Sequence, residues 1–232
     1  MEDRRILQSQ DGDLRRHVDL IAREFLEGFE LVNRITSPAV TMFGSARVTE
    51  EHRAYGQARA VGRLFGEAGW SVVTGGGGGV MEAANRGCKE GGGFSVGFNI
   101  QLPFEQRPNP YLDLEYTFGH FYSRKTMLVK ASEGFVLFAG GFGMCDEMFE
   151  ALTLIQTGKV RHFPVVLFDT AFWSGLTAWI RETLFREGTV SPDDVEFLHV
   201  TDDPEEAFAI VAQCYERRCA DVPAALVKED AQ

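Results

Sequence analysis

Two glycine-rich corners and a group of acidic residues are the parts of this sequence whose residue types and spacing suit chemistry. The apolar run 135–138 leads into GGFG at 140–143, and Asp146, Glu147 and Glu150 follow within one helical pattern. Glycine lets a backbone approach a ligand closely because no Cβ intervenes. A helix that begins there also presents free N–H groups to an anion. The corner is therefore predicted to bind a phosphate or a carboxylate.

The second corner is TGGGGG at residues 74–79, which ends one apolar run and precedes another helical pattern. A tight turn needs fewer than five consecutive glycines, so we favour a binding loop over a purely structural turn. No Gly-Lys-Ser/Thr follows, which excludes a P-loop, and the next apolar run carries Asn99 where a dinucleotide-binding fold has an acid. If the two corners lie at neighbouring strand ends, they form one cleft.

Charged residues near these corners are candidates for ligand contacts. Two cations, Arg124 and Lys125, stand early in a predicted helix, where the helix dipole disfavours them. The forked donors of Arg124 suit an anionic or polar ligand group, whereas Lys125 fits a solvated ion pair equally well. Glu147 and Glu150 share one helix face, so at least one of them meets the ligand if that face borders the cleft. Glu105, after another apolar run, is a further candidate.

Alternation of apolar runs with amphipathic segments predicts the fold that must position these residues. The class expected is α/β, a Rossmann-like doubly wound sheet of about seven mostly parallel strands with helices on both faces. Ligands bind beyond the carboxyl ends of the strands in such sheets. The predicted strands are 39–46, 70–74, 94–100, 114–119, 134–141, 163–169 and 196–203, and the predicted helices are 13–35, 55–68, 81–92, 120–132, 144–158, 171–185 and 204–218.

We divide the chain into an N-terminal helical extension (1–37), a Rossmann-like nucleotide-binding catalytic domain (38–220) and a flexible C-terminal tail (221–232). The formal charge of −11 over 232 residues argues against a nucleic-acid surface. No segment has the length and apolarity of a signal peptide core or a membrane span, so a cytoplasmic protein is expected. The cysteines lack paired spacing and are predicted to be free thiols rather than disulfides or zinc ligands; they are Cys88, Cys145, Cys214 and Cys219.

The segments GGGGGVMEAANRG, SRKTM and GGFGMCDEMFEALTLIQTGK resemble the Lonely Guy (LOG) family of cytokinin-activating nucleotide phosphoribohydrolases, many of which are labelled lysine decarboxylase-like. The resemblance covers about residues 38 to 190. It implies hydrolysis of the N-glycosidic bond of an adenine-type nucleoside 5′-monophosphate, either AMP or a cytokinin ribotide. The products would be free base and ribose 5-phosphate, with no cofactor and no metal. It also implies a longer bacterial form that assembles as a homodimer or larger homo-oligomer.

The LOG signature Pro-Gly-Gly-x-Gly-Thr-x-x-Glu reads AGGFGMCDE at residues 139–147. The resemblance implies that Arg124 and Glu147 are catalytic. Glu147 would stabilise the oxocarbenium-like sugar and position water, while Arg124 would orient the ribose or Glu147. The remaining implied substrate contacts are Thr74, Gly75, Gly76, Gly77, Glu105, Lys125, Gly140, Gly141, Phe142, Gly143, Met144, Cys145, Asp146 and Thr153.

Two other functions stay open beside hydrolysis. Met144 stands where the family has threonine, and a lost hydrogen bond to a charged group is worth about 1.5–3 kcal/mol. If that hydrogen bond is missing, the chain would be a nucleotide-binding module with weak or no catalysis. An amino-acid decarboxylase with pyridoxal phosphate needs a Schiff-base lysine. Lys125 and Lys130 are candidates only because they are lysines, so this function ranks last.

Overall fold

The protein is described by a computed structural model that covers residues 11–103, 107–160, 163–196 and 198–221. Seven strands form one sheet in the order β4-β3-β2-β1-β5-β6-β7, and every pairing is parallel. This confirms the predicted α/β doubly wound fold. The strands are β1 (Ala39–Phe43), β2 (Ser71–Thr74), β3 (Ser95–Ile100), β4 (Leu114–Phe118), β5 (Phe135–Leu137), β6 (Val165–Phe168) and β7 (Leu198–Thr201).

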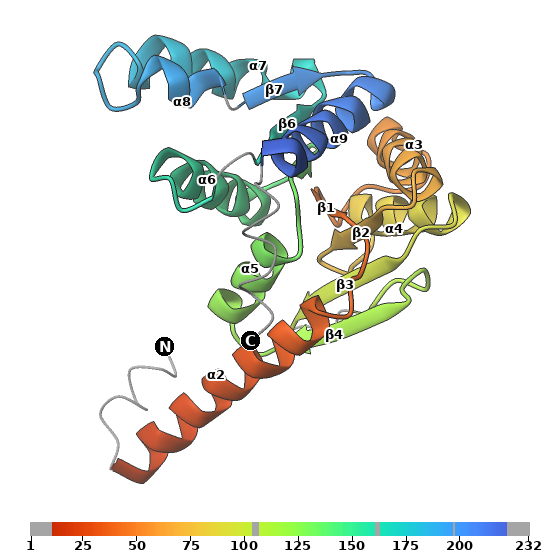
Figure 1. The fold of residues 1–232 in the computed structure, drawn as a ribbon, viewed down its shortest axis with the longest axis vertical. Coiled ribbons are helices and arrows are strands. Elements are labelled where there is room, and N and C mark those ends of the chain that lie inside the picture. The colour runs from red at the N-terminus through yellow and green to blue at the C-terminus, as the bar shows by residue number, and fades with distance from the viewer. Residues whose placement is uncertain (1–10, 104–106, 161–162, 197, 222–232) are drawn as a thin grey trace.

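Helices cover both faces of the sheet and explain why its inner strands are buried at every position (Figure 1). On one face lie α3 (Arg53–Glu67), α4 (Val80–Glu90) and α9 (Pro204–Asp221), which share a buried core with the strands. On the other face lie α2 (Asp11–Val32), α5 (Phe121–Lys130), α6 (Phe142–Gln156) and α7 (Thr170–Trp179), which enclose a second core. The two edge strands, β4 and β7, alternate between buried and exposed residues instead.

The N-terminal helix α2 packs along α5, the helix that carries Arg124 (Figure 1). Glu24 of α2 accepts hydrogen bonds from Gly119 N at 2.7 Å and from Ser123 Oγ at 2.6 Å. Burial by itself would raise the pKa of Glu24, but the hydrogen bonds from Ser123, His120 and Gly119 outweigh it and hold the pKa below its usual value. Glu24 thus fixes the start of α5 from a segment outside the predicted catalytic domain.

Three features of the C-terminal third differ from the prediction. Helix α7 continues as a π-helix, η1 (Ile180–Leu184), and a short helix α8 (Pro192–Glu196) occupies a segment predicted as loop. Reciprocal hydrogen bonds between Ser191 and Asp194 cap α8, which is the Ser-x-x-Asp pattern of a capping box. Helix α9 extends to Asp221, so the first residue of the predicted tail is helical; the rest, 222–232, lies outside the described residues.

Candidate active site

The two glycine corners lie on either side of β1, because β2 and β5 both pair with that strand. The two corners therefore do not end neighbouring strands, and β1 separates them. The loop after β1 joins them: Ser45 O accepts a hydrogen bond from Val80 N at 3.1 Å, and Ser45 N donates to Ala139 O at 3.0 Å. Three strand ends thus build the site, at the point where the winding of the sheet reverses and where such folds bind ligands.

The loop at residues 74–79 needs glycine for two separate reasons. Gly76 and Gly79 have φ of 73° and 66°, a region that residues with a side chain rarely adopt. A Cβ on Gly75 would lie 2.4 Å from Arg124 Nη2. Thr74 is fully buried, and its hydroxyl accepts from Gly76 N at 2.9 Å. Thr74 therefore shapes the loop, and Gly75 leaves room for the guanidinium.

Arg124 reaches the site from α5 and is largely withdrawn from water. Its Nε donates a hydrogen bond to Phe98 O, at 2.7 Å, near the end of β3. Burial lowers the pKa of Arg124, and the negative charge of Glu147 opposes that shift. The guanidinium keeps its charge because an arginine pKa starts far above neutrality. A cation is thereby fixed beside the glycine loop.

Glu147, in α6, is the acidic partner of Arg124, and its side chain is only 5% exposed. Burial raises the pKa of Glu147 to about 7, against the opposing attraction of Arg124 and Lys125. Within the described residues, its Oε2 is buried and accepts no hydrogen bond. A buried carboxyl with an unused oxygen and a pKa near neutrality is typical of a functional group.

Lys125 forms ion pairs with two acids of α6. Its Nζ lies 2.9 Å from Asp146 Oδ2 and 2.9 Å from Glu150 Oε2. Burial by itself disfavours the ammonium, but Glu150 and Asp146 reverse this and raise the pKa of Lys125. The lysine therefore stays protonated, with much of its charge offset, and links α5 to α6.

The start of α6 offers unoccupied donors next to this group. Gly141 is the N-cap residue and supplies no side-chain cap, so no capping oxygen occupies the first N–H groups of the helix. Gly141, Phe142 and Gly143 are exposed, and Phe142 reaches 95% exposure. The arrangement therefore pairs an anion-binding helix start with a buried carboxyl and a buried guanidinium.

Comparison with known proteins identifies the family of this chain. The family model described as "Possible lysine decarboxylase" matches residues 81–211. A cytokinin riboside 5′-monophosphate phosphoribohydrolase from Mycobacterium tuberculosis is 31% identical over 161 residues, which cover 67% of this chain and 83% of that protein. One of the same name from Rhodococcoides fascians is 27% identical over 183 residues, covering 77% and 91%. The chain belongs to the LOG family.

Solved structures support the fold of this LOG chain. The molybdenum cofactor binding protein from Rippkaea orientalis superposes with a TM-score of 0.59 at 22% identity, covering 78% of this chain and 99% of that one. A second solved structure, TM1055, gives a TM-score of 0.56 at 26% identity, covering 76% and 99%. At 22% identity, the likeness to the Rippkaea orientalis structure concerns the fold alone.

The side chain of Met144, the residue that departs from the LOG signature, lies in the core. The Met144 side chain is 6% exposed and belongs to the core between α6 and the sheet. It packs against Gly140, where an added Cβ would lie 3.1 Å from Met144 Cβ. The missing threonine hydroxyl is thus replaced by an apolar group that points into the core, and the exposed N–H groups of the loop remain.

Some predicted contacts lie away from Arg124 and Glu147 or outside the described residues. Thr153 is on α6 but lines a separate cavity with Leu152 and Ile180, and its hydroxyl donates to Phe149 O at 2.7 Å. Cys145 is partly buried against the core. Gly77 O accepts from the side chain of Asn109 at 3.0 Å, so this carbonyl holds the loop in place. Glu105 lies outside the described residues.

Sequence reasoning missed one side of the site. A cavity of about 500 Å³ lies at the carboxyl ends of β1, β5 and β6, and we call it the switch-point cavity. An acid directly after the buried strand FPVVLF was a usable signal for Asp169, because ligands bind at that end of a parallel sheet. Gly140 was predicted as part of the second glycine corner, and nothing in the sequence pattern singled out the remaining lining residues. The lining residues are Ser45, Val48, His52, Arg53, Ala139, Gly140, Asp169 and Phe172.

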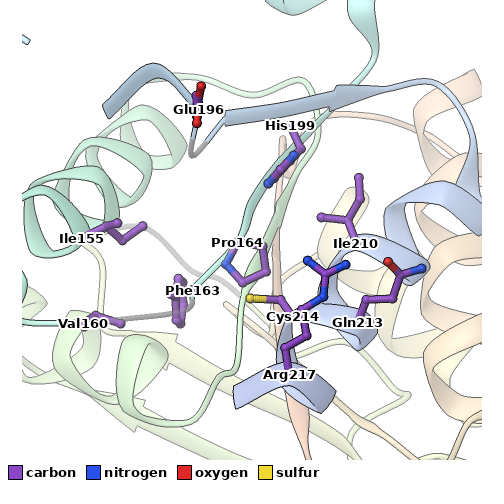
Figure 2. A pocket seen from close by; sticks show the side chains of 10 residues that line it. All are labelled: Ile155, Val160, Phe163, Pro164, Glu196, His199, Ile210, Gln213, Cys214 and Arg217. Atoms are coloured by element: carbon purple, nitrogen blue, oxygen red, sulfur yellow. The ribbon is translucent and has the colours of Figure 1, made fainter. Parts of the chain in front are cut away.

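A second cavity, of about 560 Å³, lies at the opposite, amino-terminal end of β6 and β7 (Figure 2). Ile155, Val160 and Phe163 lie on one side of it, and Gln213 and Arg217 of α9 lie on the other (Figure 2). None of the residues predicted to bind substrate lines it. Volume alone would favour this cavity, but the carboxyl ends of the strands carry the glycine loops and lie near the buried carboxyl of Glu147 and the guanidinium of Arg124.

Proposed function

We propose that this protein hydrolyses the N-glycosidic bond of a nucleoside 5′-monophosphate and releases the free base and ribose 5-phosphate. The observation that carries the proposal is the buried Glu147 carboxyl, with its unused oxygen and raised pKa, beside Arg124 and the open start of α6. The relatives named as phosphoribohydrolases support the same chemistry. The base is adenine or an N6-substituted adenine, as those names suggest.

The residues suit an oxocarbenium-like transition state. As the bond between C1′ and the base nitrogen lengthens, positive charge develops on the ribose, and the ionised Glu147 stabilises it. Glu147 also accepts a proton from the attacking water, whose oxygen bonds to C1′, and a proton reaches the departing base. The charge of Arg124 lowers the pKa of Glu147 against the effect of burial and so favours the ionised carboxylate. The phosphate, remote from the broken bond, aligns the sugar through the start of α6.

Chromatography of reactions with AMP and with N6-isopentenyl-AMP tests the proposal. The parent protein is expected to release free base, and Glu147→Gln is expected to lose at least about 100-fold in kcat, the usual contribution of a general base. Glu150→Gln, on the same helix, is the matched control and keeps most of the activity. Because the base must be ionised, kcat/KM rises with pH through about 7. A parent that releases no base from either nucleotide refutes the proposal.

Features of the same site distinguish the two alternative functions from hydrolysis. A nucleotide-binding module would retain AMP in equilibrium dialysis without releasing base, and Met144, which brings no hydroxyl, is the feature that favours it. A pyridoxal phosphate decarboxylase is disfavoured because Lys125 is paired with Asp146 and Glu150, which raise its pKa and oppose the neutral amine of a Schiff base. Lys130, the other candidate Schiff-base lysine, is exposed in the last turn of α5.

Self-association belongs to the proposal as well. Phe121 and Tyr122 at the start of α5 are 54% and 45% exposed, and Phe142 at the start of α6 is 95% exposed. Met127 of α5 is, by contrast, fully buried in the core. We expect a homodimer or larger homo-oligomer that covers the exposed aromatic residues, and light scattering after size-exclusion chromatography measures its mass.

Within the described residues, no helix is long and apolar enough to cross a membrane.

A further inference from the structure

The switch-point cavity contains an ion pair that neither the fold nor the proposed chemistry requires. Arg53, the first residue of α3, donates a hydrogen bond through Nη2 to Asp169 Oδ2. A cation at the start of a helix opposes the helix dipole, so the position itself does not favour arginine. Both residues line the cavity together with Gly140 of the second glycine corner.

Asp169 is held in an unusual backbone conformation that fixes its carboxylate. Its φ is 91°, and it is the one non-glycine residue with positive φ in the described part of the chain. Its N–H donates to Thr201 O at 3.0 Å, and its side chain accepts from Phe172 N at 3.4 Å as the N-cap of α7. Such strain costs about 1–3 kcal/mol and persists only where neighbouring structure imposes it. The carboxylate is therefore a fixed anchor for Arg53.

The exposure of the two side chains shows which of them is available to a ligand. The Asp169 side chain is 9% exposed, whereas that of Arg53 is 62% exposed. An ordinary surface ion pair exposes both partners and contributes little to stability. Here the anion lies beneath, and the guanidinium, which has five N–H donors, faces the open cavity.

The charges of the site leave a role for a further cation. A phosphate at the start of α6 would lie near three acids of that helix, Asp146, Glu147 and Glu150. Lys125 is already paired with two of them, and Arg124 is withdrawn from water with its Nε bonded to Phe98 O. Met144 supplies no hydroxyl to the phosphate loop, since its side chain packs in the core.

We propose that Arg53, positioned by Asp169, binds the phosphate group of the nucleotide from the side of the switch-point cavity opposite the start of α6. The inference rests on the proposed function, since it assigns Arg53 to the same substrate. Arg53 supplies a charged, forked donor where the LOG signature supplies a threonine hydroxyl, and arginine matches the geometry of phosphate oxygens. The ligand class is a sugar phosphate, and Arg53 does not contact the base.

Steady-state kinetics of Arg53→Ala with AMP and with adenosine tests this role. Arg53 is partly exposed, so the loss of its charged hydrogen bond to the phosphate is expected to raise KM for AMP about 10-fold. The ratio of kcat/KM for AMP to that for adenosine falls by the same factor, because adenosine lacks the phosphate. Arg53→Lys recovers part of the loss. Arg63→Ala, an exposed arginine of the same helix, is the matched control and keeps the parental ratio.

A binding measurement separates this inference from the proposed function. Calorimetric titration of Glu147→Gln with ribose 5-phosphate, with and without Arg53→Ala, reports phosphate affinity without any hydrolysis. A loss of about 10-fold supports the Arg53 site even if the parent hydrolyses no nucleotide. Unchanged affinity overturns the inference even if the parent is an active hydrolase. Asp169→Gly, which tolerates the positive φ, is expected to weaken binding in the same direction because it frees Arg53.

Discussion

Replacing Glu147 by glutamine should make the protein more stable at alkaline pH while removing its activity. The folded state raises the pKa of Glu147 from 4.5, the value for an exposed glutamate, to about 7 because the carboxyl is buried. Between these values the folded chain holds a proton that the unfolded chain has released. Stability therefore falls as pH rises from about 4.5 to about 7, and the full loss is present above that range.

The size of the effect follows from the two pKa values. At about 1.4 kcal/mol for each pK unit, the raised pKa of Glu147 costs the folded state about 3 kcal/mol at pH 8 and about 1 kcal/mol at pH 5.5. The attraction of Arg124 is already contained in the raised pKa. Glutamine has nearly the same shape and does not ionise, so the variant is spared this cost.

Urea unfolding of the parent and of Glu147→Gln at pH 5.5 and pH 8, at equal protein concentration, measures the difference. The variant is expected to gain more at pH 8 than at pH 5.5, with the two gains separated by about 2 kcal/mol. Glu150→Gln, whose carboxylate is partly exposed and paired with Lys125, is the control and should gain nothing. A Glu147→Gln variant that is no more stable than the parent at either pH would refute the reasoning that the carboxyl is desolvated.

Three further changes test separate contacts. Gly75→Ala should lower kcat/KM by about 10-fold or more in the hydrolysis assay, because its Cβ would lie 2.4 Å from Arg124 Nη2; unaltered kinetics would mean that Arg124 need not stay there. Met144→Thr should lower the free energy of unfolding by about 1–3 kcal/mol in urea, since it removes buried apolar atoms and buries a hydroxyl; a neutral result would place Met144 outside the core. Glu24→Gln should lower stability by about 1.5–3 kcal/mol at pH 7 in urea. Because the pKa of Glu24 is depressed, that deficit should shrink as pH falls below about 4.5 and the parent carboxylate takes up its proton; a deficit independent of pH would contradict the assigned hydrogen bonds.

The elements that could be predicted are those governed by local pattern. The strands at 71–74 and 165–168 are buried at every position because helices cover both faces of the sheet, and their runs of apolar residues are readable without coordinates. The glycine corner at 74–79 could also be predicted, since five consecutive glycines indicate a backbone whose conformation or close contacts leave no room for side chains. The short helix α8 carried a capping signal in Ser191 and Asp194 that was there to be used.

The relations between distant segments could not be predicted. Strand order puts β1 between the two glycine corners, and Glu24, from a segment predicted as an extension, holds the helix of Arg124. Arg53 and Asp169 are 116 residues apart and meet only because α3 begins, and β6 ends, at the switch-point cavity. Such pairings depend on crossover direction and packing, which no local window of sequence contains.

The sequence by itself thus determined the strand and helix pattern, the parallel sheet, the glycine corners and the candidacy of Arg124 and Glu147. Tertiary structure alone decided that Glu147 is buried with a pKa near 7, that Met144 faces the core, that Thr153 lines another cavity, and that Arg53 opens onto the site. The physical reason is that burial and electrostatic environment are properties of all the segments that surround a residue. Residue type and spacing record only what the local chain prefers.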